Sequence, residues 1–459
     1  MALLIHANDG WLLSHEIFLE SMYRNLHYCV QASVPDTVPE SNHSEIRPIS
    51  CNLVPVTTCY LNLKSNVQFK ITCDGTCDAC NNVTVDNKNH EKILNAKPKK
   101  DMFGIRTPFL MDSAARKIAK LKRHSSETQE REESKSKKVS LKFFKPKEEY
   151  IFKTTAKIIQ LGFEINQFHP EPITSEEWLQ NNSCARNFVK RLNSYEVIAK
   201  DMCMPSTSSE TKAELGAMQC GLENRLVEYT GSSPCIVTHD RKSFLLPPHS
   251  SFLWSDIIAL DVFINAGKKF DAILMDPPWE NKSVKRKKGY AVVANEKLCH
   301  LPIPQLAKPG TLVLVWSTNN DNQISFIKNQ LFPYWSVYHC ADWYWVKVTQ
   351  KGEPVYPFGN PHKKPFENLI IGRFLVDSHD MGSFQPVEED KVLVSVPSAV
   401  HSHKPPLSEV LKPYLPEGAK GLELFARYLL PHWTSCGNEV LKLQNLDCFE
   451  QVFTTVQRV

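Results

Sequence analysis

Residues 270–279 read FDAILMDPPW, and this stretch decides the fold that we expect. Its apolar opening is typical of a buried strand, which the acid and the two prolines then end. Each proline fixes its own φ, and Pro278 keeps Pro277 out of the helical region. The main chain at Asp276 is therefore expected to be extended and stiff, with the carbonyl of Pro277 pointing outward.

The sequence from about residue 225 onward alternates short apolar runs with amphipathic stretches. Such runs predict strands buried on both faces of a sheet, and helices between them predict a doubly wound α/β domain. Ligands of such domains bind beyond the carboxyl ends of the strands, which is where Asp276 is expected. The runs are CIVTH, SFLLPP, DAILMD, TLVLVW, HCADWYWVKV, NLIIGRF, KVLVSV, GLELFA and NEVLKL.

The preceding half of the chain differs in character. Of the 459 residues, we expect 1–30 to form a helical segment, 31–147 a basic linker of low order, 148–224 a helical accessory region and 225–459 the α/β domain. No apolar run is long enough to span a membrane, and the N-terminus does not resemble a signal peptide.

Lysine and arginine far outnumber acidic residues between Lys97 and Lys147. This block indicates contact with nucleic acid or a nuclear-import signal, and it is also consistent with a solvated linker. The 14 cysteines are scattered, which favours a reducing compartment. Cys73, Cys77 and Cys80 have the spacing of iron–sulfur or zinc ligands, but they lie in polar, aperiodic sequence, and we expect no bound metal.

The side chains at the end of the 270–279 run suggest a specific chemistry. The Asp276 carboxylate and the Pro277 carbonyl are two acceptors in fixed relation, which matches the two N–H donors of a primary amine. Trp279 can stack on the ring that carries the amine. For the amine of adenine, the carboxylate would stabilise positive charge that develops as the nitrogen attacks an electrophilic methyl group.

A basic loop, NKSVKRKKGY (281–290), follows at once. Lys282, Lys285 and Arg286 would neutralise phosphates near Asp276, which positions a nucleic-acid strand without reading its sequence. Because a base inside a duplex cannot reach such a pocket, we expect the target to be single-stranded or flipped out.

Over about 225–445 the sequence resembles the MT-A type adenine-N6 methyltransferases, which use S-adenosylmethionine. The resemblance is carried by SFLWSDI, DPPWENKSVKR, LVLVWSTN, HKKPFENLIIGR, SVPSAVHSHKPPL, LELFAR and WTSCGNEVLK. Several of these are similar to the branch called methyltransferase-like protein four. The resemblance implies a Rossmann-like α/β fold with a permuted motif order, because the DPPW strand precedes the LELFAR strand.

The resemblance also implies roles for individual residues. Those that would hold the adenine and carry the catalysis are Asp276, Pro277, Pro278 and Trp279. Those that would hold the cofactor, with Asp276, are Asp256, Ile257, Lys404, Glu423, Leu424, Phe425, Arg427, Asn438 and Glu439. Tyr290, Trp316 and Glu367 would line the base pocket. The sequence departs from other branches at Glu439, where Gln is frequent, and at Ala426, where Gly is frequent.

The substrate that the resemblance implies is RNA, in particular a 2′-O-methylated adenosine of spliceosomal (U2) small nuclear RNA. Single-stranded or other DNA is the alternative substrate. A non-catalytic binding subunit and a protein-amide methyltransferase are further alternatives, although the intact DPPW and the basic loop favour the enzyme on nucleic acid. The basic clusters favour a nuclear location, with the cytoplasm also open. A protein partner is not determined by the sequence.

Overall fold

The structure is a computed structural model, and it describes residues 3–24, 26–28, 60–63, 68–72, 90–109, 145–169, 171–202, 224–239, 242–279, 293–360, 363–376, 382 and 384–457. Among these residues the α-helices are α1 (His15–Met22), α4 (Pro146–Glu164), α5 (Ser175–Gln180), α6 (Ser183–Met202), α7 (Asp261–Asn265), α9 (Asn295–Cys299), α10 (Ile303–Leu306), α11 (Asp321–Phe326), α12 (Phe332–Tyr334) and α13 (Ser408–Leu411). None of these helices is both long and apolar enough to cross a membrane.

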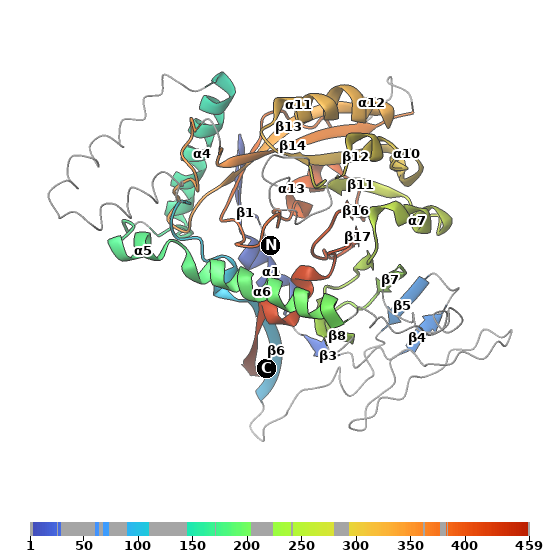
Figure 1. The fold of residues 1–459 in the computed structure, drawn as a ribbon, viewed down its shortest axis with the longest axis horizontal. Helices are drawn as coiled ribbons and strands as arrows, with labels where there is room; N and C mark the ends of the chain where they lie inside the picture. The colour runs from blue at the N-terminus through green and yellow to red at the C-terminus, as the bar shows by residue number, and fades with distance from the viewer. Residues whose placement is uncertain are drawn as a thin grey trace.

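The described strands form one large sheet and two small ones (Figure 1). The large sheet is built, in spatial order, from β1 (Leu3–Ala7), β2 (Gly10–Leu13), β15 (Val392–Ser395), β13 (Val337–Lys347), β14 (Phe366–Phe374), β12 (Ala307–Ser317), β11 (Phe270–Met275), β16 (Gly421–Leu424), β17 (Trp433–Cys436), β10 (Ser251–Leu253), β7 (Leu226–Tyr229), β5 (Gln68–Thr72) and β4 (Tyr60–Leu63). One small sheet pairs β6 (His90–Pro98) with β18 (Phe449–Gln457). The other has the order β3 (His27–Tyr28), β8 (Cys235–His239) and β9 (Lys242–Leu246), with β8 in the middle.

The centre of the large sheet is parallel. Strand β11 pairs in parallel with β12 and β16, β16 with β17, and β17 with β10. Strand β14 runs antiparallel to its neighbours β12 and β13, while β13, β15 and β2 are parallel to one another. The carboxyl ends of β2, β15, β13, β12, β11, β16, β17 and β10 therefore lie along one edge of the sheet, together with the amino end of β14.

Both faces of the sheet are buried, as the uninterrupted apolar runs predicted. Successive residues of β11 alternate between two clusters, with Leu274 in one and Ile273 and Met275 in the other. Helices α1, α6 and α13 contribute side chains to the first cluster, and α7, α10, α11 and α12 contribute to the second. The fold class is thus the expected Rossmann-like α/β domain, with the DPPW strand β11 preceding β16 along the chain and lying beside it.

The N-terminal segment, expected to be helical, contains one helix preceded by two strands. The Ser14 hydroxyl caps α1 by accepting from the Ile17 N–H at 3.2 Å. Upstream of it, β2 is buried at all four positions and pairs with β15, so it extends the large sheet. The helical expectation is corrected here because tertiary pairing gives the apolar residues 10–13 a strand partner far along the chain.

The range 31–147, expected to be of low order, holds strands β4, β5 and β6 among its described residues, and each pairs with another strand. In the expected accessory region 148–224, the described residues 148–169 and 171–202 form α4, α5 and α6, and residues 203–223 lie outside the described residues. Pro146 opens α4, with Glu148 and Glu149 in its first turn, and Thr174 forms a capping box at α5. The run NEVLKL is not a strand: residues 437–441 form a turn after β17, and Lys442–Gln444 form the 3-10 helix η7.

Candidate active site

Four strand ends at the parallel centre of the sheet carry most of the expected site residues. Asp276 directly follows β11, Phe425 directly follows β16, Asn438 lies two residues after β17, and Asp256 lies three residues after β10. Because these strands are parallel, the four positions lie along the same edge. The sheet topology therefore brings together segments separated by more than a hundred residues in the sequence.

The Asp-Pro-Pro-Trp turn is fixed by two hydrogen bonds of Trp279. Its backbone N–H donates to the Pro277 carbonyl at 2.8 Å, and its indole Nε1 donates to the Trp316 carbonyl at 2.8 Å. The Pro277 carbonyl was expected to point outward; it accepts this bond, and a carbonyl oxygen has a second lone pair. The turn is thereby tied to the end of the neighbouring strand β12.

Both tryptophans of the expected base pocket are buried. Trp279 is 6% exposed and Trp316 is 1% exposed, and each packs within an apolar cluster. In this structure Trp279 anchors the turn, because its ring is covered by protein and its N–H is bonded. The stacking role expected for it stays a prediction. Trp316 faces Trp345 edge-on, with ring centroids 5.9 Å apart.

A network of alternating charges surrounds Asp276. The buried Lys404 Nζ lies 3.2 Å from Asp276 Oδ2 and 2.7 Å from Glu367 Oε2, and Lys347 pairs with the other oxygen of Glu367. The Ser402 hydroxyl donates to Asp276 Oδ2 at 2.7 Å. Burial acts to lower the pKa of Lys404, but the two carboxylates outweigh it and raise that pKa. All five side chains therefore form one connected polar cluster at the sheet edge.

Glu423, on β16, is the second acid at this edge. It is 6% exposed, and its Oε2 has no hydrogen-bond partner among the described residues. Burial, reinforced by the negative charge of Asp276, raises the pKa of the Glu423 carboxyl to about 8. Its register neighbour on β17, Ser435, likewise has a buried hydroxyl without a partner among those residues. Burial and the same two acids raise the pKa of Tyr428 well above its usual value.

The end of β16 and the turn that follows it depart from the expected roles at Leu424, the last residue of the strand. Leu424 is fully buried in the apolar core, so its side chain cannot line a cofactor and only its main chain could contribute. Phe425 has a φ of 61°, a left-handed conformation that turns the chain sharply at the strand end. The Ala426 N–H then donates to the Cys436 carbonyl at 3.0 Å, which brings this turn against β17.

The other expected cofactor residues are distributed around that turn. Arg427 Nε lies 2.9 Å from Glu439 Oε2, and Lys442 lies 2.8 Å from the other oxygen of Glu439. Burial acts to raise the pKa of Glu439, but these two cations lower it. Arg427 was expected to meet a cofactor carboxylate, and in this structure its ion pair is with Glu439. Asn438 is exposed, and its carbonyl accepts from Trp254 Nε1 at 3.1 Å.

At the end of β10, Asp256 is exposed, whereas Ile257 is 9% exposed and packs into the apolar cluster. The basic loop and one cysteine-containing segment fall outside the described residues, so what the sequence predicts for them stays a prediction. The residues are Lys282, Lys285, Arg286, Tyr290, Cys73, Cys77 and Cys80. Within the part of the chain that is described, no group of three potential ligands forms a metal site.

The described side chains fit the adenosine and methionine parts of S-adenosylmethionine. A buried polar atom without a partner is rare in proteins and indicates an absent ligand or water. Three such atoms lie on or next to residues of this edge: Glu423 Oε2, Ser435 Oγ and Trp316 Nε1. A carboxylate such as Glu423 accepts from the two hydroxyl groups of a ribose, and Lys404 can neutralise a carboxylate.

Sequence reasoning missed Ser402, Lys347 and His15. Lys347 is the last residue of β13, and His15 follows β2, so each belongs to a strand end on the same edge. The ring of His15 packs 5.2 Å from that of His403, and neither of its buried nitrogens has a partner among the described residues. The signal for Ser402 was its place two residues before Lys404; no signal distinguished His15.

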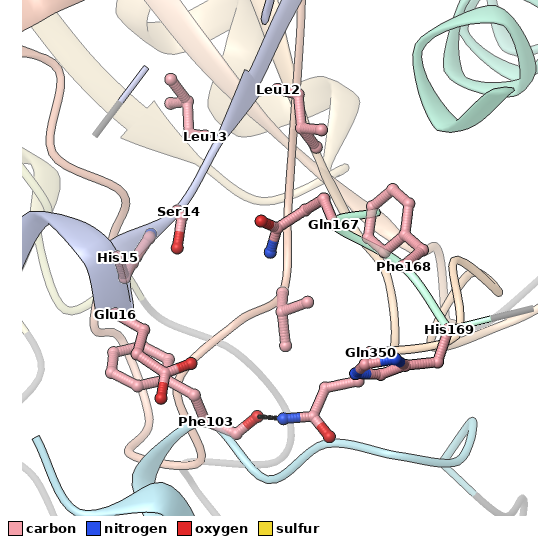
Figure 2. Close-up of a pocket in the computed structure, with 11 residues that line it drawn as sticks. Leu12, Leu13, Ser14, His15, Glu16, Phe103, Gln167, Phe168, His169 and Gln350 are labelled. Carbon is pink, nitrogen blue, oxygen red and sulfur yellow. Dashed lines mark hydrogen bonds between the residues drawn. The ribbon is translucent and has the colours of Figure 1, made fainter. Parts of the chain in front are cut away.

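A separate polar cavity of about 100 Å³ lies beyond His15 (Figure 2). In Figure 2 the amide of Gln167 extends toward its centre, and Gln350 Nε2 donates to the Phe103 carbonyl at 3.2 Å. No lysine or arginine of the described chain lines this cavity. It also contains none of the residues that the sequence singled out.

The fold and this edge define a class: a Rossmann-like α/β protein with an Asp-Pro-Pro-Trp turn and further acids at the ends of the parallel strands beside it. Residues 270–439 match the family described as MT-A70. A "DNA N6-methyl methyltransferase" of Caenorhabditis elegans is 32% identical over 375 residues, which cover 79% of this chain and 94% of that protein. The chain therefore belongs to the MT-A70 family, whose methyltransferases use S-adenosylmethionine as methyl donor.

Two further relatives match over shorter stretches. The "N(6)-adenine-specific methyltransferase METTL4" of Mus musculus is 45% identical over 241 residues, 51% of each chain. The "N6-methyladenosine RNA methyltransferase MTA1" of Pyricularia oryzae is 33% identical over 211 residues, 44% of this chain and 55% of that protein. The match with the mouse protein thus spans about half of its length.

Proposed function

We propose that this protein is an S-adenosylmethionine-dependent methyltransferase that acts on the N6 amine of adenine in nucleic acid. The observation that carries the proposal is the placement of Asp276 at the end of the central parallel strand, with one carboxylate oxygen held by Ser402 and Lys404. The relatives that match are named as adenine methyltransferases of DNA or RNA, which supports the same reaction.

The chain's own residues supply an acceptor pair for the amine. Asp276 and the remaining lone pair of the Pro277 carbonyl would accept the two N–H groups, which favours a pyramidal nitrogen with a localised lone pair. When bound, S-adenosylmethionine supplies the electrophilic methyl group. The Asp276 carboxylate then stabilises the positive charge that grows on the nitrogen, and it is available to accept the released proton.

The cofactor would be held by Glu423, Asp256 and Asn438 on its nucleoside part and by Lys404 on its carboxylate. In this structure Lys404 is bonded to Asp276 and Glu367, so binding an additional carboxylate would redistribute the charge around Asp276. Trp279 contributes by fixing the turn. The basic residues Lys282, Lys285 and Arg286 are assigned to phosphates of the substrate strand, and Tyr290 to the base, from the sequence alone.

The substrate that we propose first is RNA, and within it a 2′-O-methylated adenosine of spliceosomal small nuclear RNA, in the nucleus with the cytoplasm as a second location. Support comes from the sequence resemblance and from the Pyricularia oryzae relative, which is named as an RNA methyltransferase. DNA adenine is a second candidate, because the Caenorhabditis elegans relative, 94% of whose length is matched, is named as a DNA methyltransferase.

The test is transfer of labelled methyl from S-adenosylmethionine to small nuclear RNA, messenger RNA, and single- and double-stranded DNA. Asp276→Ala and Asp276→Asn are compared with Asp271→Asn, a matched control because Asp271 lies on the same strand at its opposite end and pairs with Lys308 at 2.8 Å. We expect label on adenine N6 that is lost in both Asp276 variants and retained in the control.

Label mainly on DNA would overturn the RNA assignment and leave the reaction intact. Label that survives Asp276→Ala would overturn the mechanism. No label on any substrate, with S-adenosylmethionine bound, would favour a binding subunit.

A further inference from the structure

Ser402 lies in the segment after β15, two residues before Lys404. Its hydroxyl donates to Asp276 Oδ2 at 2.7 Å, and Lys404 Nζ lies 3.2 Å from the same oxygen. Both donors therefore meet one of the two carboxylate oxygens. Among the described residues no donor meets the other oxygen, Oδ1. A carboxylate held in this way has its plane fixed and one oxygen left to accept from a ligand.

The backbone of Ser402 is itself unusual. Its φ is 62°, a left-handed conformation that is uncommon for a residue with a side chain and persists only where the surroundings impose it. The chain is held on both sides: the His401 carbonyl accepts from Arg427 Nη1 at 2.8 Å, and Lys404 is buried. The turn thus holds the hydroxyl in one place relative to Asp276.

The contacts of Lys404 explain why the Ser402 hydroxyl is needed as a second donor to orient the Asp276 carboxylate. The ammonium of Lys404 is shared between Asp276 and Glu367, and it lies closer to Glu367, at 2.7 Å against 3.2 Å. An ammonium on a flexible stem places little constraint on the rotation of a carboxylate. The serine hydroxyl is on a shorter side chain, and its neutral donor does not neutralise the charge. The Ser402 hydroxyl can therefore set the orientation of the Asp276 carboxylate more narrowly than the Lys404 ammonium alone.

From this geometry we propose that Ser402 is a positioning residue: it orients the Asp276 carboxylate so that Oδ1 faces the amine of the target adenine. The inference rests on the proposed function, since it deepens the description of the same site. A positioning role can be distinguished from a purely structural role of the turn. If the turn needed only its backbone conformation, glycine at position 402 would stabilise it, because glycine adopts a left-handed φ freely.

The experiment compares Ser402→Ala, Ser402→Gly and Ser402→Cys with wild type in two measurements. The first is single-turnover methyl transfer together with the Kd of S-adenosylmethionine. The second is equilibrium binding of an oligouridylate that carries one adenosine, and of the same oligouridylate with purine riboside, which lacks the amine. Ser398→Ala is the matched control, because its hydroxyl accepts from the Val400 N–H at 3.1 Å within the same segment and does not touch Asp276.

We expect Ser402→Ala and Ser402→Gly to lower the transfer rate by about tenfold or more, the scale of a lost hydrogen bond to a charged group, with the Kd of S-adenosylmethionine unchanged. Ser402→Cys, a weak donor, should fall between them and wild type. In binding, wild type should prefer adenosine over purine riboside, and both Ala and Gly variants should lose that preference. Ser398→Ala should match wild type in both measurements.

Four results would overturn the inference. They are full activity in all Ser402 variants, recovery in Ser402→Gly alone, an equal loss in Ser398→Ala, and no preference for adenosine in wild type. If wild type prefers adenosine, the Ser402 variants lose that preference, and no protein transfers methyl, then the proposed function fails and the positioning role stands.

Discussion

Lys404 offers the sharpest test of the charge network, because it is a buried cation between two carboxylates. Replacing it with methionine nearly keeps the length of the side chain and removes the charge, which leaves Asp276 and Glu367 without their shared partner. Removing one member of a buried ion pair costs about 3–5 kcal/mol, since the other charge remains buried and uncompensated. Here Glu367 keeps Lys347, and the Asp276 and Glu367 side chains are 19% and 23% exposed.

These two features place the expected loss at the lower end, about 3 kcal/mol in the free energy of unfolding. The assay is urea denaturation at pH 7. The loss is calculated from the shift in the denaturation midpoint, provided that the slope m is the same in the variant and in wild type. The control is Lys308→Met, which breaks a 2.8 Å pair with Asp271 whose lysine side chain is 42% exposed, and it should cost about 1 kcal/mol or less. Adding Asp276→Asn to Lys404→Met should recover about 1–2 kcal/mol, because it removes the carboxylate that Lys404→Met leaves uncompensated. A loss for Lys404→Met no larger than that of the control would refute the reasoning.

Three further predictions concern stability. The pKa of Glu423 is raised to about 8, so between about pH 4.5 and pH 8 the native state holds a proton that the unfolded chain has released. The free energy of unfolding should therefore fall across this range, with a slope up to about 1.4 kcal/mol per pH unit. Denaturation series at several pH values should show that Glu423→Gln flattens this slope. Burial acts to raise the pKa of Asp342, but His339 and Lys328 lower it to about 2; its contribution should therefore be present above about pH 4 and be lost as pH falls toward 2, and Asp342→Asn should remove that acid limb. His15→Ala should destabilise by about 3 kcal/mol through the cavity it leaves, whereas His15→Phe should stay within about 1 kcal/mol of wild type because it deletes two unpartnered nitrogens; an unaffected His15→Ala midpoint would contradict the burial.

The strand ends that carry the site could be predicted from local pattern. A strand formed by an apolar run that precedes Asp-Pro-Pro must end near Asp276 whatever its neighbours in the sheet, because the prolines cannot continue the strand. The same reasoning placed β12, β14, β15 and β16 correctly. The apolar pattern failed for NEVLKL, which begins just after Gly437. A β-carbon added at Gly437 would come within 2.9 Å of the Ala426 carbonyl oxygen, so the chain here packs closely against the turn that follows β16.

The roles of particular side chains were harder to predict. Trp279 is flat and follows the acid, which suggested stacking, but its indole found a buried partner in the Trp316 carbonyl. Leu424 lies within a motif that resembles a cofactor loop, yet strand alternation turns its side chain into the core. In both cases the residue type was compatible with two environments, and packing selected one.

The sequence by itself determined the α/β class, the strand that ends at Asp276, the family, and the candidates Asp276, Glu367, Lys404 and Glu423 at the site. Only the tertiary structure decided that β2 joins β15, that His15 lies against His403, and that Lys404 lies between Asp276 and Glu367. The physical reason is that strand formation follows from local periodicity and from proline, whereas the partner of each strand end depends on sheet order and register. Those are set by the burial of two apolar faces between residues far apart in the chain.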